Sequence, residues 1–109
     1  MTDTIRRELF VPAEAAKKLR ANAAASGSTL SDDLGKLIER YADGGLQGAG
    51  GEIDIVNVAD PGKSKSDKKV RINVPESIWE QARVRAIMDE TTIASVVRRA
   101  TLALSNDSL

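Results

Sequence analysis

The 109-residue sequence contains no cysteine and no histidine. Without thiols there is no disulfide and no cysteine nucleophile, and without imidazole there is neither a histidine general base nor the usual ligand of zinc or copper sites. These absences leave few ways to build an active site, and they suit a reducing compartment. We therefore expect a protein that is not an enzyme and that uses no cofactor or metal.

Long apolar runs are also missing from the sequence. The N-terminal residues do not form the apolar core of a signal peptide, and no stretch approaches the ~18 apolar residues of a transmembrane helix. A chain of this length forms one compact domain or two very small halves. The sequence thus predicts a cytoplasmic protein with no membrane association.

The formal net charge is zero, but the charge is unevenly distributed along the chain. Residues 1–42 carry seven Lys/Arg and six Asp/Glu, residues 43–62 carry none and four, and residues 63–109 carry nine and six. Charges interact mainly within about 10 Å at ordinary ionic strength, so a local basic surface can attract phosphate while a distant acidic segment cancels the total. Overall neutrality therefore does not exclude a nucleic-acid partner.

A short alternating stretch occurs twice. Residues 69–74 read Lys-Val-Arg-Ile-Asn-Val before Pro75, and a weaker version at residues 6–11, Arg-Arg-Glu-Leu-Phe-Val, stands before Pro12. Alternation of polar and apolar residues predicts a strand with one buried face, and each proline can end a strand and begin a helix. The outward positions of the two predicted strands are Lys69, Arg71 and Asn73, and Arg6, Glu8 and Phe10.

Two helical patterns follow the first strand. Residues 13–26 are rich in alanine, and Gly27 is expected to end that helix in a left-handed cap. A second helix is predicted to begin at Thr29, whose hydroxyl stands three residues before Asp32 as in a capping box. Its apolar stripe consists of Leu30, Leu34, Leu37, Ile38 and Tyr41.

The second strand is followed by the same pattern. A helix is predicted over residues 76–88, with a turn at residues 89–91 and a further helix that begins at Thr92. The buried face of the first of these helices is predicted to hold Ile78, Ala82 and Ala86, widened by Trp79 and Ile87. The stripe of the second is Ile93, Val96, Val97, Ala100 and Leu104.

The chain therefore divides into a first unit (residues 1–42), a flexible acidic linker (43–67) and a second unit (68–109). A unit of about 40 residues rarely folds alone, so each unit needs another to cover its apolar face. Within the linker, the β-like segment Glu52–Val58 is either an extended segment that covers an apolar surface or a strand that binds a partner.

The order strand, proline, helix, turn and helix, together with the segment Ser-Val-Val-Arg-Arg-Ala-Thr at residues 95–101, resembles the ribbon-helix-helix DNA-binding family, to which Arc and MetJ belong. Two such units in one chain resemble the tandem TraY-type accessory proteins of plasmid conjugation. The resemblance covers residues 5–42 and 68–104. It implies an α+β fold in which two βαα units form one pseudo-two-fold domain, with a two-stranded antiparallel ribbon that enters the DNA major groove.

The outward strand residues are the predicted base readers, because Lys and Arg suit guanine and Asn suits adenine in the major groove. The full set is Lys69, Arg71, Asn73, Arg6, Glu8 and Phe10. The plainer alternative is that these residues are polar because water touches them. Phe10 either contacts a thymine methyl group or wedges at a base step, or it packs under a terminus or the linker. The predicted phosphate sites are the helix N-termini near Ser28, Thr29, Thr91 and Thr92.

The charges at the strand centres favour pairing within one chain. The resemblance implies that the residue four before each proline lies at the centre of the pairing. With this register, two first strands would place Glu8 against Glu8, and two second strands would place Arg71 against Arg71, whereas a mixed pair places Glu8 opposite Arg71. The linker of about 25 residues is long enough to return across a small domain. The sequence therefore favours a monomer with intramolecular strand pairing, with a swapped dimer as the alternative.

Double-stranded DNA is thus the predicted partner, at a conjugative transfer origin, a partition site or a promoter, and a relaxase or another DNA-processing protein is a further candidate partner. The alternative is an antitoxin that binds DNA and neutralises a partner protein. Antitoxins often carry a longer tail after the second helix, whereas five residues follow Leu104 here.

Other charged residues have simpler explanations. The acidic side chains at helix starts are accounted for by capping and by the helix dipole: Asp32, Asp33, Asp89 and Glu90. The basic pairs Lys17–Lys18 and Arg98–Arg99 are expected to be solvated or to make nonspecific phosphate contacts.

Overall fold

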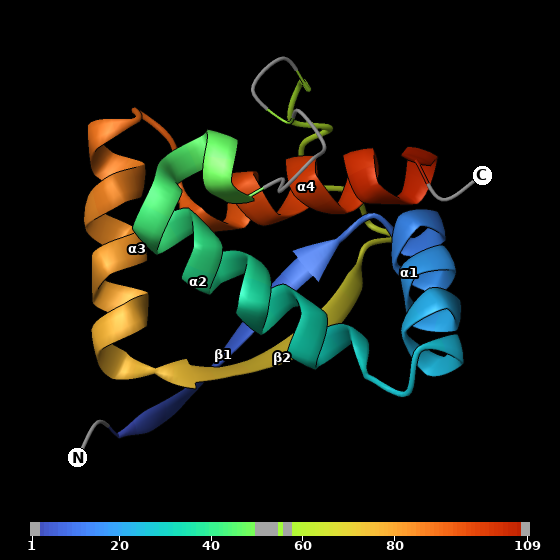
Figure 1. The fold of residues 1–109 in the computed structure, drawn as a ribbon. Coiled ribbons are helices and arrows are strands. Elements are labelled where there is room, and N and C mark those ends of the chain that lie inside the picture. Colours follow the sequence, from blue (N-terminus) through green and yellow to red (C-terminus); the bar gives the residue numbers. More distant parts are fainter. Residues whose placement is uncertain (1–2, 50–54, 56–57, 108–109) are drawn as a thin grey trace.

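The computed structural model describes residues 3–49, 55 and 58–107. In this part, the chain forms a small fold with a two-stranded antiparallel sheet and four helices (Figure 1), which agrees with the predicted α+β class. The elements in chain order are β1 (Thr4–Val11), α1 (Ala13–Ala25), α2 (Leu30–Ala49), β2 (Lys68–Pro75), α3 (Glu76–Met88) and α4 (Ile93–Asp107).

The sheet is formed by antiparallel pairing of β1 with β2, as the charges at the strand centres predicted. Glu8 lies opposite Arg71, and the ladder extends from Thr4 opposite Pro75 to Val11 opposite Lys68. Five of the inward positions are buried, and they belong to both strands: Leu9, Val11, Val70, Ile72 and Val74. The two distant stretches of alternating sequence therefore share one ladder and one apolar face.

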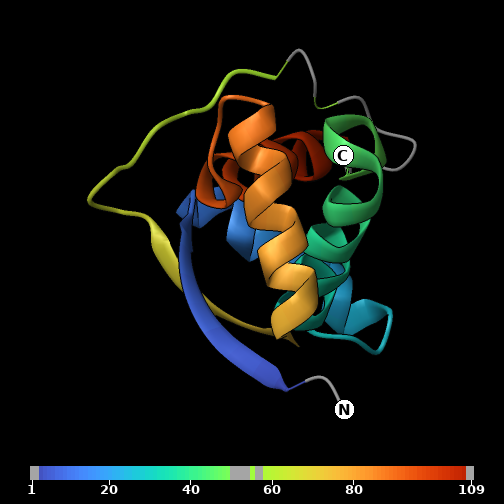
Figure 2. The ribbon, with the colours of Figure 1, turned by 90° about the vertical axis from the view of Figure 1, so that its left-hand side faces the viewer.

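The helices cover this apolar face and leave the other face of the ribbon open (Figure 2). The closest helix partners come from different halves of the chain, since α2 packs against α3 and α1 packs against α4. The stripe predicted for α2 is buried at every position: Leu30, Leu34, Leu37, Ile38 and Tyr41. The Tyr41 hydroxyl also donates a hydrogen bond of 2.8 Å to Asp89 Oδ2 beyond the end of α3. Each half therefore supplies the cover that the other half lacks.

Both predicted helix starts are confirmed by their caps. Thr29 Oγ1 accepts a hydrogen bond of 3.1 Å from the backbone N–H of Asp32, and Thr92 Oγ1 accepts one of 3.0 Å from the N–H of Ser95. Each hydroxyl satisfies a backbone donor that the first helical turn would otherwise leave unpaired. No helix in the described part of the chain is both long and apolar enough to cross a membrane.

The end of α2 differs from the sequence prediction. The helix continues to Ala49, whereas the first unit was predicted to end at residue 42. The interruption occurs at Gly45, whose φ of 68° and ψ of −156° are not helical, and the chain then resumes a helical path. The glycines at 44, 45 and 48 suggested a flexible linker, but Ala49 is buried, so the apolar stripe persists through them.

Two positions on α1 and α3 also differ from the prediction. Ile87 was expected to widen the buried face of α3, but its side chain is 64% exposed. Ala24 stands on the same face of the α1 pattern as Ala16 and Ala23, which suggested burial, and it is exposed as well. Ile87 lies roughly 100° around the helix from the buried Ala86, because an α-helix turns once in 3.6 residues. The apolar strip that α3 buries is therefore narrower than its sequence suggests.

The linker is attached to α4. Asp60 accepts two hydrogen bonds from the Arg98 guanidinium, at 2.8 Å and 2.6 Å, and Arg99 donates to the carbonyl oxygens of Val58 (2.7 Å) and Ile55 (3.1 Å). Arg98 is 7% exposed, so the prediction of a solvated or phosphate-binding Arg98–Arg99 pair was wrong. The physical reason is that both arginines satisfy acceptors of the linker itself.

The β-like segment Glu52–Val58 lies largely outside the described residues. Of its residues, Ile55 is fully buried and Val58 packs against the core. These two contacts agree with the interpretation of an extended segment that covers an apolar surface.

The turns between the helices of each half have the same shape but different residues. Gly27 has φ 76° and Glu90, at the equivalent position, has φ 57°. Ser28 N–H donates to Ala23 O and Thr91 N–H donates to Ala86 O, both at 2.8 Å. A left-handed backbone suits glycine and strains a residue that carries a Cβ.

We therefore expect Glu90→Gly to raise the free energy of unfolding by about 0.5–1 kcal/mol and Gly27→Ala to lower it by about 1 kcal/mol. An added Cβ at Gly27 meets no atom within 4 Å, so the loss would reflect backbone strain alone. Urea unfolding of the variants measures both effects. Glu90→Ala keeps a Cβ and is the control. Its free energy of unfolding should not rise above that of the wild type. A Glu90→Gly protein no more stable than the wild type would contradict this reading.

Candidate nucleic-acid interface

The open face of the ribbon brings all six predicted base readers together. They form three cross-strand rows, with Arg6 opposite Asn73, Glu8 opposite Arg71 and Phe10 opposite Lys69, and all six side chains are exposed. Because the helices lie on the other side of the strands, this face is accessible along its length (Figure 2). We refer to these six residues as the ribbon face.

Glu8 at the centre of the ribbon face is surrounded by cations. Its Oε2 lies 3.0 Å from Lys69 Nζ, and this hydrogen bond, with the positive charges of Lys69, Arg71 and Arg6, holds the pKa of Glu8 below its usual value. The register placed Glu8 opposite Arg71 as predicted, but the ion pair is made with the diagonal neighbour Lys69. Three cations against one carboxylate leave the ribbon face with a local positive charge.

Phe10 is the one large apolar side chain on the ribbon face. It is 47% exposed, so about half of its surface remains open to solvent. An exposed aromatic ring among charged side chains is available for contact with an apolar group on a partner, such as a thymine methyl.

Arg7 departs from simple alternation. Its place in β1 predicts an inward side chain, yet Arg7 is exposed and its guanidinium carbon lies 5.3 Å from the centroid of the Trp79 ring. A cation over an indole face is a favourable arrangement, which accounts for a charged residue at an inward position. The half-buried Trp79 thus contributes to the cover of β1 from α3.

The predicted phosphate sites at Ser28, Thr29, Thr91 and Thr92 are partly occupied by the fold itself. The N–H groups of Ser28 and Thr91 donate to the preceding helices, and the hydroxyls of Thr29 and Thr92 cap the helices that follow. The helix dipole still favours an anion at each N-terminus, through the amides that come next in the chain.

The two N-termini differ in their charge. The first turn of α2 contains Asp32 and Asp33, and Asp33 accepts a hydrogen bond of 3.2 Å from the Ser28 hydroxyl, whereas the first turn of α4 has no acidic residue. Two carboxylates repel phosphate. The first turn of α4 lacks this repulsion, but Asp89 and Glu90 stand just before it and Asp60 forms a hydrogen bond with Ser95 in that turn, so carboxylates surround both N-termini.

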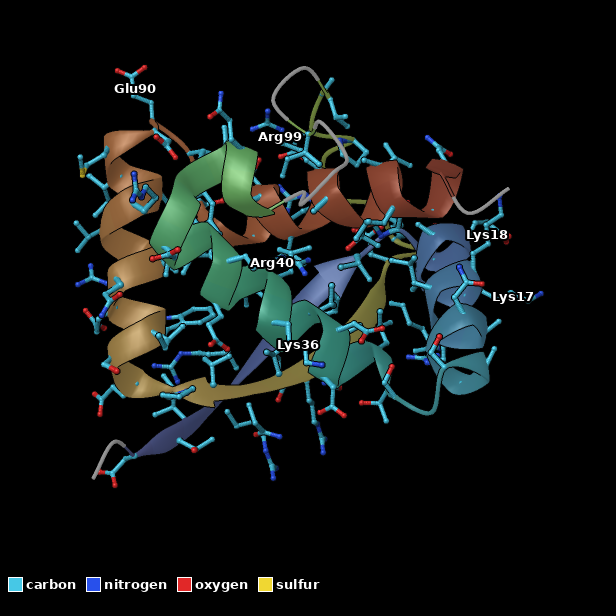
Figure 3. All side chains as sticks on the ribbon, in the orientation of Figure 1. Lys17, Lys18, Lys36, Arg40, Glu90 and Arg99 are labelled. Carbon is cyan, nitrogen blue, oxygen red and sulfur yellow. The ribbon has the colours of Figure 1, made fainter. Side chains whose placement is uncertain are left out.

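One basic residue beside the ribbon was missed from the sequence. Lys36 lines an open hollow of about 430 Å³ together with Ser28 and Asn73, where the start of α2 meets the end of β2. Helix α2 packs on the strand at Gly35, where an added Cβ would lie 3.6 Å from the carbonyl oxygen of Asn73, an ordinary van der Waals contact. Lys36 is exposed and projects from α2 in Figure 3.

Lys17 and Lys18 were predicted to be solvated, and both are exposed on α1, away from the ribbon (Figure 3). Among the residues that the structure describes, no group of three or more Asp or Glu side chains is arranged to hold a metal ion.

No protein-family model, curated protein or solved structure matches this chain. The geometry of the ribbon face and the chemistry of its side chains are therefore the basis on which a function can be inferred.

Proposed function

We propose that the protein binds double-stranded DNA by placing the β1–β2 ribbon in the major groove, as a tandem ribbon-helix-helix domain with pseudo-two-fold symmetry. The observation that carries the proposal is the register of β1 against β2, which gathers six side chains with base-reading chemistry on one open face. A two-stranded ribbon fits the major groove, which is about 12 Å wide. The packing of each helix against a helix of the other half also agrees with an interlocked pair of units.

Each row of the ribbon face has a chemical role in this proposal. Arg71 and Lys69 donate to guanine O6 and N7, Asn73 pairs with adenine, and Glu8 accepts from the amino group of cytosine. The ion pair between Glu8 and Lys69 does not block this role, because both side chains are about half exposed and an exposed ion pair is weak. Glu8 and Lys69 can therefore each leave the ion pair and form a hydrogen bond with a base at little cost in free energy.

The two strands offer different residues, and this determines the type of site. Arg6, Glu8 and Phe10 of β1 stand against Lys69, Arg71 and Asn73 of β2. A homodimeric reader with identical strands matches a palindrome, since operator symmetry mirrors protein symmetry. We infer that this ribbon reads an asymmetric sequence.

In biological terms, the proposal is a DNA-binding accessory protein of a plasmid or mobile element, acting at a conjugative transfer origin within a relaxosome, or a transcriptional repressor. The support is the tandem arrangement of two strand–helix–helix patterns in one chain. A relaxase is the candidate protein partner in the first case.

Selection of duplexes from a random pool, followed by titration, tests the proposal directly. We expect one asymmetric sequence to be enriched and to bind on the order of a thousandfold or more tighter than a scrambled duplex at the same salt concentration. The affinity should fall as salt increases, because cations on the protein displace counterions from phosphate. Single-stranded DNA of the same sequence is the control. If no duplex is enriched, or if the single strand binds equally well, the protein does not read the major groove.

A further inference from the structure

The outer surface of α3 carries an apolar patch that the proposed DNA contact does not use. Val84, Ile87 and Met88 are 50%, 64% and 71% exposed. Residues spaced by three and four positions share one face of a helix, so these three side chains form one continuous strip. Val84 and Met88 also line an open hollow of about 440 Å³ with Ala42 of α2. Clustered exposed apolar side chains are typical of a contact surface.

The equivalent surface of α1 is flat. Because Pro75 follows Pro12 by 63 residues, the counterparts of Val84, Ile87 and Met88 are three alanines. All three are exposed: Ala21, Ala24 and Ala25. The two halves of the chain thus differ at this face, with bulky apolar side chains on α3 and small ones on α1. A raised apolar strip on one helix can pack into the shallow surface of the other.

The charges around the two surfaces are opposite in sign. Helix α1 carries three basic side chains, Lys17, Lys18 and Arg20, against Glu14. Helix α3 and the turn after it carry four carboxylates against two arginines: Glu76, Glu80, Asp89 and Glu90, and Arg83 and Arg85. Lys17 occupies the position equivalent to Glu80, so the sign is reversed at matching places in the two helices.

The two surfaces lie at opposite ends of the molecule. Figures 1 and 2 show α1 and α3 at opposite ends of the ribbon, and Figure 3 shows Lys17 and Lys18 pointing outward at one end while Glu90 points outward at the other. They cannot meet within one molecule. They can meet when two copies stand in a row.

We propose that copies of this protein associate head to tail, with the α3 surface of one copy (Val84, Ile87 and Met88) packed on the α1 surface of the next (Ala21, Ala24 and Ala25). A contact between two α3 surfaces would bring like charges together, whereas the contact of α3 with α1 brings opposite charges together. Because the two surfaces differ, a free α3 surface remains at one end of the row and a free α1 surface at the other. Further copies can therefore join at either end. On DNA with adjacent sites, this contact would make binding cooperative, a consequence that rests on the proposed function.

Sedimentation of the full chain without DNA tests the contact separately from DNA binding. We expect the average mass of the wild type to rise with protein concentration and to fall with added salt. Two double variants each disrupt one surface: Ile87→Ala with Met88→Ala on α3, and Lys17→Glu with Lys18→Glu on α1. Each should weaken association on the order of tenfold or more. Lys63→Glu with Lys65→Glu, which makes the same charge change in the exposed part of the linker, should leave association unchanged.

Mixing the two variants distinguishes a head-to-tail contact from a symmetric one. The α1 variant keeps an intact α3 surface and the α3 variant keeps an intact α1 surface, so an equimolar mixture should form dimers that do not grow further. The substituted positions are exposed, and alanines occupy the equivalent places in α1, so both variants should fold as the wild type does by circular dichroism. Dimers formed by the α1 variant alone would indicate a symmetric contact of α3 with α3 and overturn the proposal. A wild type that stays monomeric at every concentration would also overturn it.

Discussion

Replacing Arg71 with alanine is expected to weaken binding to the preferred duplex by about 1–3 kcal/mol, roughly 5- to 150-fold, and to change binding to a scrambled duplex much less. Arg71 stands at the centre of the ribbon face opposite Glu8, where both strands are paired on either side of it. A guanidinium in this position can hold guanine O6 and N7 with two hydrogen bonds. The loss of those bonds lowers the affinity only for a duplex that carries guanine at this position.

Titrations of each variant on both duplexes at one salt concentration measure this effect. Lys36→Ala removes a candidate phosphate contact beside the ribbon face. This variant should lower the affinity for both duplexes by a similar factor. Lys63→Ala removes the same charge from the exposed part of the linker, outside both strands. This control should leave the affinity for both duplexes nearly unchanged. Equal losses on both duplexes for Arg71→Ala would show that Arg71 contacts the backbone and does not read a base.

Removing Asp60 is expected to lower the free energy of unfolding by about 2–3 kcal/mol, because Arg98 would be left without its carboxylate partner. The side chain of Arg98 is 9% exposed and that of Asp60 is 31% exposed. An unpaired charge is costly where water cannot reach it. Asp60→Ala should therefore cost more than Arg98→Met, which removes the buried charge, keeps the apolar stem and leaves a carboxylate that water can reach.

The same ion pair should make stability depend on pH. The hydrogen bonds from Arg98, with a further one from the Gly62 N–H, hold the pKa of Asp60 well below its ordinary value. A carboxyl with a lowered pKa in the folded state stabilises the protein fully above the pKa of the unfolded chain, about 3.9, and this contribution is lost progressively as the pH falls from there to the lowered pKa of the folded state. Unfolding in urea at pH 7 and pH 3 should show that the difference in stability between wild type and Asp60→Asn is largest at pH 7 and smaller at pH 3, where the unfolded carboxyl is already mostly protonated. A difference that does not change with pH would contradict this origin.

Much of the fold could be predicted because its signals are local. Alternation ended by Pro12 and Pro75 located the strands, and the hydroxyls of Thr29 and Thr92 located two helix starts. The choice of a mixed strand pair followed from charge, since Glu8 could oppose Arg71 without repulsion in a mixed pair only, while the centre of the pairing was implied by the family resemblance. These features depend on neighbours in sequence or on the sign of a charge, both of which can be read without coordinates.

The features that were missed depend on contacts between distant segments. Arg98 binds a carboxylate 38 residues before it, and no local pattern identifies that partner. The same holds for Lys36, whose position beside Asn73 results from the packing of α2 on β2. The continuation of α2 through Gly45 was hidden because local propensity treats glycine as a loop residue, while burial of Ala49 favours helix. Tertiary packing decided each of these cases.

The attachment of the linker to α4 also bears on how a newly made chain chooses its strand partner. Arg98 and Arg99 hold residues 55, 58 and 60 against their own helix, so the tether that leads into β2 starts from a fixed point on the same molecule. A short tether gives the two strands an effective local concentration on the order of millimolar, far above that of strands on other copies. Release of this anchor would lengthen the tether and lower that advantage, so exchange of strands between molecules should become easier in concentrated solutions of an anchor-deficient chain.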